Sequence, residues 1–96
     1  MKQKYDIREF VDVPTRQSTL SALVDRVKAC RKARGLSQKQ LAERSGVSYA
    51  SVRRFETQGE ISLASLLRIA QTLDRLQDFD ALFHAAPITD LKEFPQ

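Results

Sequence analysis

Four residues in the middle of the chain combine side chains and spacing that suit contact with nucleic acid. An arginine fork can donate to O6 and N7 of one guanine, which discriminates between bases by about 1–3 kcal/mol. A small residue beside it lets a helix approach the bases closely and abut a thymine methyl group, and a tyrosine can reach a phosphate or a sugar. The four form two adjacent pairs spaced one helical turn apart, so a helix would place them on one exposed side. The predicted base contacts in the major groove are Tyr49, Ala50, Arg53 and Arg54, with Arg54 as the first candidate.

Short polar side chains stand at the expected starts of two helices in the same region. The first N–H groups of a helix have no partner within it, so these ends already favour an anion. Serines at such positions also cap helices, and capping is compatible with a phosphate contact. The predicted phosphate contacts are Ser37, Gln38, Ser48 and Ser51.

The elements that must position these groups are two short helices joined by a tight turn, within residues 38–57. Two helices can cross closely only where the contact residue is small, which suits Ala42, and the turn needs a residue that tolerates positive φ, which suits Gly46. The candidate site then stays outside while apolar residues face inward. The pattern predicts a helix-turn-helix whose inward residues are Leu41, Val47, Val52 and Phe55.

A longer helix is expected before this motif. Apolar residues from Leu20 to Cys30 recur at spacings of three and four, which defines one buried stripe. Ser18 or Thr19 is expected to cap the start of this helix, and Gly35 to end it.

Four shorter helices complete the expected fold. A capping box of Ser37 with Gln40 opens the first of them, and Ser62 caps the one that follows the helix-turn-helix. Their expected extents are about 38–44, 48–57, 63–73 and 77–84. The expected buried residues of the last two are Leu63, Leu66, Leu67, Ala70 and Leu73, and then Phe79, Leu82 and Phe83. Five helices with short connections predict an all-α, five-helix bundle.

The chain divides into three parts. Residues 1–17 alternate apolar and polar side chains before Pro14, which favours a short extended N-terminal arm. Residues 18–84 form the helix-turn-helix domain. Residues 85–96 hold two prolines and mixed polarity, so we expect a loosely ordered C-terminal tail.

Positive charge is concentrated in the predicted site. Nine Lys and Arg residues and a single acid, Glu43, lie between Arg26 and Arg54, which gives this segment +8, whereas the net charge of the chain is +4 and the remainder therefore carries −4. Such a split is expected where one face meets phosphate and the other does not. Glu56 follows this segment, and its spacing predicts an ion pair with Arg53.

The remaining residues argue against an enzyme, a metal site, a cofactor and a membrane span. Cys30 falls in a helical stripe and is expected to be a small core residue, while His84 stands alone near a helix end. Asp78 and Asp80 do not face each other on a helix. No apolar run approaches the roughly 18 residues of a membrane span, and no signal peptide is recognisable. We therefore expect a cytoplasmic protein that is not an enzyme.

The segments GLSQKQLAERSGVSYASVRRFE and ISLASLLRIAQTL resemble the phage-repressor-like (Xre/Cro) helix-turn-helix proteins, over about residues 20–83. The resemblance implies base contacts from the exposed first turn of the second motif helix. It also implies that Gln38 bridges a phosphate and the first base-contacting side chain. Tyr49 departs from the pattern, where family members often carry glutamine, so the base preference at that step does not carry over.

A narrower resemblance concerns the segment RRFETQGEISLASLLRIAQTLDRLQDFDALF, which is similar to the HipB-like antitoxins encoded beside HipA-type kinase toxins. It implies an antitoxin that represses its own operon and binds a HipA-like kinase toxin. The alternative is a stand-alone phage- or plasmid-type regulator with no toxin partner. Either protein is expected to be a homodimer on a two-fold operator in double-stranded DNA, because one recognition helix covers too few base pairs.

Overall fold

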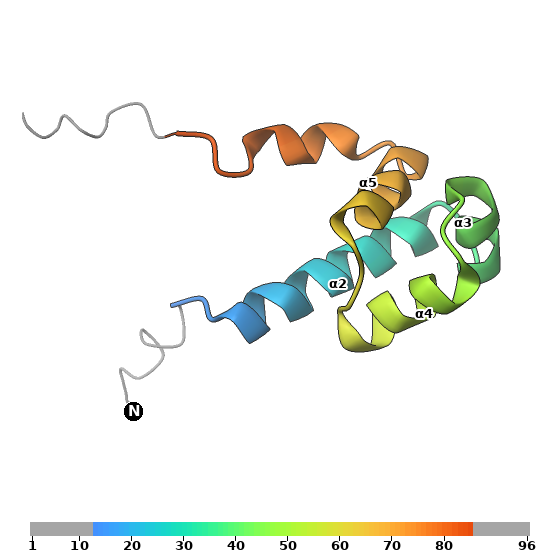
Figure 1. The fold of residues 1–96 in the computed structure, drawn as a ribbon, viewed down its shortest axis with the longest axis horizontal. Coiled ribbons are helices and arrows are strands. Elements are labelled where there is room, and N and C mark those ends of the chain that lie inside the picture. Colours follow the sequence, from blue (N-terminus) through green and yellow to red (C-terminus); the bar gives the residue numbers. More distant parts are fainter. Residues whose placement is uncertain (1–12, 86–96) are drawn as a thin grey trace, which may run out of the picture.

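The computed structural model describes residues 13–85, and within this range every regular element is a helix (Figure 1). Its five elements confirm the all-α prediction. The predicted N-terminal arm lies mostly, and the predicted C-terminal tail almost wholly, outside the described residues. The elements are α2 (Arg16–Ala33), α3 (Gln38–Ser45), α4 (Tyr49–Gln58), α5 (Leu63–Thr72) and the 3₁₀ helix η1 (Leu76–Ala81).

Side chains close to each helix start explain where the helices begin. The Ser37 hydroxyl accepts from the Gln40 N–H at 3.0 Å while the Gln40 side chain accepts from the Ser37 N–H at 2.8 Å, which confirms the predicted capping box. Serine hydroxyls also cap α4 and α5, at Ser48 and Ser62, as predicted.

The predicted cap of the first helix is wrong. Thr15 caps α2, in a reciprocal capping box with Ser18, so the helix begins one turn before the expected start. The apolar stripe begins only at Leu20 because the first turn of α2 is exposed and needs no apolar side chain. The apolar stripe therefore indicates only the part of the helix that packs on the core, and the helix itself begins before that part.

The core forms where α3, α4 and α5 pack against the C-terminal half of α2. All four residues predicted to face inward from the helix-turn-helix are buried, and the fully buried side chains are Leu41, Val52, Phe55 and Ile69. The stripe of α5 differs from the prediction: Leu63 is 64% exposed, and Ile69, which was not predicted, is buried in its place. Leu63 is the first residue of α5, before the turns that pack on the core.

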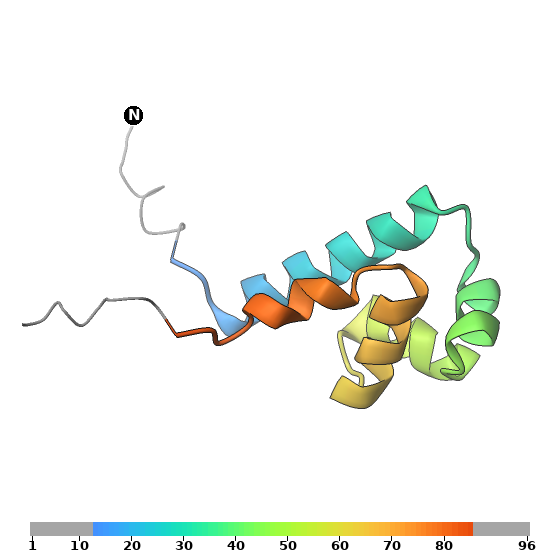
Figure 2. The same ribbon diagram turned by 90° about the horizontal axis from the view of Figure 1, so that it is seen from above.

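The predicted fifth helix is shorter and tighter than expected. η1 ends at Ala81, and Phe83 has a positive φ of 57°, which turns the chain out of the helix. Of its three predicted apolar residues only Phe79 packs on the core, whereas Leu82 is 56% exposed and the Phe83 side chain is fully exposed. Seen from above, η1 lies alongside the N-terminal half of α2, away from α3 (Figure 2).

Gly46 and Gly59 share a left-handed backbone but differ in how closely other residues pack against them. Gly46 has a φ of 78° and Gly59 a φ of 75°. A Cβ added at Gly46 would lie 3.9 Å from Nη1 of Arg68, which is ordinary van der Waals contact, whereas one at Gly59 would lie 2.8 Å from Cδ2 of Leu20. Glycine at residue 59 is therefore favoured for two reasons: its left-handed backbone, and the close approach of the Leu20 side chain of α2 to the end of α4.

We predict that Gly46→Ala lowers the free energy of unfolding by about 1–2 kcal/mol, the cost of a left-handed residue with a side chain. Gly59→Ala should cost more, because the new methyl group also displaces Leu20. Urea denaturation followed by circular dichroism measures both. In a Leu20→Ala background the two glycine substitutions should cost the same; an undiminished excess at Gly59 would contradict the packing explanation.

Candidate nucleic-acid interface

The second helix of the motif, α4, separates an exposed face from a buried one. Val52, Phe55 and Glu56 are buried. The four predicted base contacts are all exposed on the other side, which is the arrangement that the sequence predicted for them: Tyr49, Ala50, Arg53 and Arg54. The structure therefore brings this set together on one accessible helix surface.

The turn between α3 and α4 explains how this surface is presented. Gly46 adopts the left-handed conformation predicted for it, and its N–H donates to the Ala42 carbonyl at 3.0 Å. Val47, which follows, is buried and anchors the turn in the core. Ala42 is also buried, so a larger residue there would push the two helices apart. This confirms the predicted helix-turn-helix.

The predicted phosphate contacts gather at the starts of α3 and α4. The Ser48 hydroxyl accepts from the Ser51 N–H at 3.0 Å and donates to the Ser51 hydroxyl at 2.8 Å. Ser37 and Ser48 are exposed, and Ser51 is half-buried. Capping therefore occupies part of the hydrogen-bonding capacity of these hydroxyls, and their contact with phosphate stays a prediction.

Gln38 differs from the serines because its side chain points toward the interior and hydrogen-bonds to a residue of α4. Its Nε2 donates to Oε1 of Glu56 at 2.8 Å, and the residue is half-buried. A primary amide carries two N–H groups, so one further donor remains for a phosphate. The hydrogen bond also links the first residue of α3 to α4.

A buried ion pair lies behind the exposed surface. Arg31 on α2 holds Glu56 on α4 with two parallel hydrogen bonds, Nε to Oε2 at 2.7 Å and Nη2 to Oε1 at 2.9 Å. Its third nitrogen, Nη1, donates to the Leu36 carbonyl at 2.8 Å. The side chains of the pair are only 9% and 2% exposed. The predicted pair of Glu56 with Arg53 is therefore wrong, because a helix distant in sequence supplies the partner.

The sequence contains one signal of this pair. Arg31 continues the buried stripe of α2, four residues beyond Val27 and seven beyond Val24, so a charged residue stands at an apolar position. Counting Arg31 only among the positive charges between Arg26 and Arg54 overlooks this position. Charges at buried positions require partners, and the stripe position of Arg31 called for a carboxylate.

Opposing effects of burial and of neighbouring charges determine the pKa of Glu56. Burial raises the pKa, but the hydrogen bonds from Arg31 and Gln38 and the positive charges of Arg31 and Lys28 outweigh it, so the pKa lies below its ordinary value of 4.5. Glu56 is therefore ionised in the folded protein at neutral pH.

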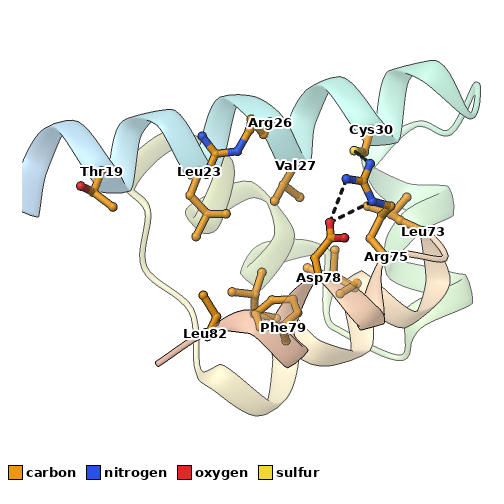
Figure 3. Close-up of a pocket in the computed structure, with 13 residues that line it drawn as sticks. Thr19, Leu23, Arg26, Val27, Cys30, Leu73, Arg75, Asp78, Phe79 and Leu82 are labelled. Carbon is orange, nitrogen blue, oxygen red and sulfur yellow. Dashed lines mark hydrogen bonds and ion pairs between the residues drawn. The ribbon is translucent and has the colours of Figure 1, made fainter. Parts of the chain in front are cut away.

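A second surface feature is a hollow of about 400 Å³ between α2, α5 and η1 (Figure 3). At its edge Arg75 donates to Asp78 at 2.9 Å, and its Nη1 lies 3.3 Å from Sγ of Cys30. Cys30 is half-buried and packs against the core from the side of this hollow. Most of the wall is apolar, formed by residues that include Leu23, Val27, Leu73, Phe79 and Leu82.

Metal binding and membrane insertion are two other properties that the described residues can be examined for. Within residues 13–85, His, Cys, Asp and Glu side chains form no group able to hold a metal ion. None of the helices in this range is both long enough and apolar enough to cross a membrane.

The chain was compared with protein families, curated proteins and solved structures. A family model described as helix-turn-helix matches residues 27–77, which is more than half of the chain. The matched range begins within α2 and ends within η1, so it contains the complete exposed surface described above. No curated protein and no solved structure matched.

The buried pair makes a prediction about stability and pH. Glu56→Gln leaves the Arg31 charge buried without its counter-charge, and should lower the free energy of unfolding by about 3–5 kcal/mol near neutral pH. The contribution of Glu56 is fully present above its unfolded pKa, close to 4.5, and is lost as the pH falls through its lower folded pKa. The stability gap between the two proteins should therefore narrow below pH 4.5.

Urea denaturation at a series of pH values measures this gap. Asp74→Asn provides the control, since Asp74 forms an ion pair with Arg34 at 2.8 Å but its side chain is 76% exposed. It should change stability by less than about 1 kcal/mol. A gap between Glu56→Gln and the wild type that stays constant from pH 7 to pH 3 would contradict the assignment.

Proposed function

The chain belongs to the Xre-like helix-turn-helix family of DNA-binding transcriptional regulators, and from this premise we propose that it represses transcription by placing α4 in the major groove of a two-fold operator. The observation that carries the proposal is the exposed face of α4. Its two arginines, Arg53 and Arg54, form no ion pair with an acid of the described residues, because the neighbouring Glu56 is engaged by Arg31. Their guanidinium groups are available to an external anion or base.

The α4 surface suits duplex DNA in shape as well as in charge. A single exposed helix with its back packed on the core is the element that the major groove admits. The capping hydroxyls of Ser37 and Ser48 stand at the starts of the two motif helices, where free N–H groups favour phosphate. In our proposal Arg53, Arg54 and Ala50 contact bases, Tyr49 lies beside them at the groove, and the starts of the two helices hold the DNA backbone.

A two-fold operator requires a dimer, and we assign the apolar hollow beside η1 to a second copy of this chain. Residues 79–83 supply both halves of a complementary pair: Phe79 of η1 and Leu82 just after it line the hollow, and Phe83 presents a fully exposed ring. In a two-fold contact each copy would place its ring in the hollow of the other. The hollow is lined from α2, α5 and η1, and none of its lining residues belongs to α4, so this contact leaves α4 free (Figure 3).

The finer proposal concerns the partner. We propose that the chain is the antitoxin of a HipA-type system, which represses its operon and binds the kinase toxin; the support is the similarity of residues 53–83 to HipB-like antitoxins. The proposal requires a kinase-like gene beside this one, and co-expression with the product of that gene tests it. A complex that co-purifies supports it, and a dimer that never binds this product would leave the stand-alone regulator as the function.

We predict that Arg54→Ala weakens binding to a duplex selected with the wild-type protein by about 1–3 kcal/mol and removes the preference at one base pair. Fluorescence anisotropy across a panel of single-base variants measures both effects. Arg16→Ala removes the same charge from the start of α2, at the opposite end of the fold from the starts of α3 and α4 (Figure 1), and should leave the base preferences unchanged. Equal behaviour of the two variants would remove Arg54 from the base-contacting set.

For the dimer we predict that Phe83→Ala raises the dissociation constant of self-association at least about tenfold, because a buried phenylalanine contributes about 1.5–3 kcal/mol. Sedimentation equilibrium measures the constant. Leu63→Ala removes another largely exposed apolar side chain, from the start of α5, and should have no effect. If Phe83→Ala associates like the wild type, the dimer contact lies elsewhere.

A further inference from the structure

The ring of Tyr49 has two positively charged neighbours, one on each helix of the motif. The Nζ atom of Lys39 lies 5.5 Å from the ring centroid, and the Cζ atom of Arg53 lies 5.6 Å from it. Both distances fall within the range of about 6 Å at which a cation is attracted to the ring quadrupole. Tyr49 is 39% exposed, so this cluster lies on the accessible side of the motif.

The positions of the three residues explain why they meet. Lys39 is the second residue of α3, Tyr49 is the first residue of α4, and Arg53 follows Tyr49 by four residues, which is one helical turn. The Tyr49 ring therefore connects the starts of the two motif helices on their exposed side. Without the ring, the two long cationic side chains would repel each other and sample many rotamers.

On the basis of the DNA-binding function proposed above, we infer that Tyr49 is a positioning residue, which holds Arg53 toward a base, and that Lys39 is a phosphate contact. Lys39 adjoins Ser37 and Gln38, so its ammonium group extends the predicted phosphate cluster at the start of α3. Ordering a long cationic side chain before it binds lowers the entropy that binding must remove. The π-face of the Tyr49 ring positions the two cations, and the Tyr49 hydroxyl is secondary to this role.

This assignment separates two roles that Tyr49 can play at a DNA surface. If the hydroxyl donated to a phosphate, phenylalanine would lose the contact. If the ring positions the two cations, phenylalanine retains it, whereas leucine, of similar bulk but without a π-face, loses it. Tyr49→Phe and Tyr49→Leu are therefore the matched pair that decides between the two.

The experiment measures binding of the full-length variants to a duplex selected with the wild-type protein. Tyr49→Phe should bind within about twofold of the wild type, and Tyr49→Leu about fivefold more weakly, as two exposed cation–π contacts imply. The preference at the base pair contacted by Arg53, located with Arg53→Ala, should weaken in Tyr49→Leu and persist in Tyr49→Phe. Equal losses in both variants, or no loss in either, would overturn the positioning role.

Lys39 is tested by the salt dependence of binding. Lys39→Gln should reduce the slope of the log–log plot by about 0.9, the value for one neutralised phosphate, and should leave the base preferences unchanged. Arg16→Gln, which removes one positive charge at an exposed position outside the segment from Arg26 to Arg54, is the control and should preserve the slope. A wild-type slope in Lys39→Gln would overturn the phosphate contact.

Nuclear magnetic resonance of the free protein tests the cluster without DNA. The side-chain protons of Lys39 and Arg53 should show upfield ring-current shifts in the wild type and Tyr49→Phe, and lose them in Tyr49→Leu. Thermal melting checks that Tyr49→Leu remains folded. Shifts in a protein that binds no duplex would refute the proposed function while leaving the cluster in place; their absence in the wild type would refute the cluster itself.

Discussion

The bidentate contact between Arg31 and Glu56 is the constraint on which the arrangement of the helices depends. The guanidinium group of α2 reaches the carboxylate of α4, and its remaining nitrogen holds the Leu36 carbonyl in the connection to α3. Gln38, the first residue of α3, donates to the same carboxylate. One buried carboxylate therefore fixes three helices relative to one another. Displacing any of them would leave a charge or a polar group buried without a partner, which costs several kcal/mol.

The same contact determines the electrostatics of the exposed surface. A carboxylate three residues from an arginine on a helix would ordinarily compete for it, and the sequence alone predicted such a pair at Glu56 and Arg53. Because Arg31 draws Glu56 into the interior, Arg53 keeps its charge facing solvent beside Tyr49. The interior pair thereby shapes the charge of the exposed face of α4. Arg53 and Glu56 are only three residues apart, yet Arg53 is exposed and Glu56 is buried, so the face stays positive beside an acidic residue in the sequence.

Sequence analysis predicted the features that depend on neighbours in the chain. The left-handed turn at Gly46, the serine caps and the inward residues of the motif all follow from the chemistry of a few consecutive residues, and the structure confirms them. The errors concern partners distant in the chain or the ends of packed stripes. Glu56 and Arg31 are separated by 25 residues, and nothing in the local pattern of either names the other. Sequence analysis places the start of α2 too late and predicts that Leu63 is buried. Hydrophobic periodicity indicates which residues pack on the core, whereas the first turn of a helix can extend beyond the packed region.

The division of α4 into two faces also separates stability from recognition. Its folding is secured by Val52, Phe55 and Glu56 on the buried side, and by the Ser48 cap and Gly59 at its two ends. Ala50, Arg53 and Arg54 are exposed, so we expect substitutions there to have little effect on the stability of α4. Tyr49 is also exposed, and the Nζ atom of Lys39 on α3 lies 5.5 Å from its ring centroid. Under the function proposed above, substitutions at the first three residues would alter base preference, whereas a substitution at Tyr49 would alter how the neighbouring cations are held.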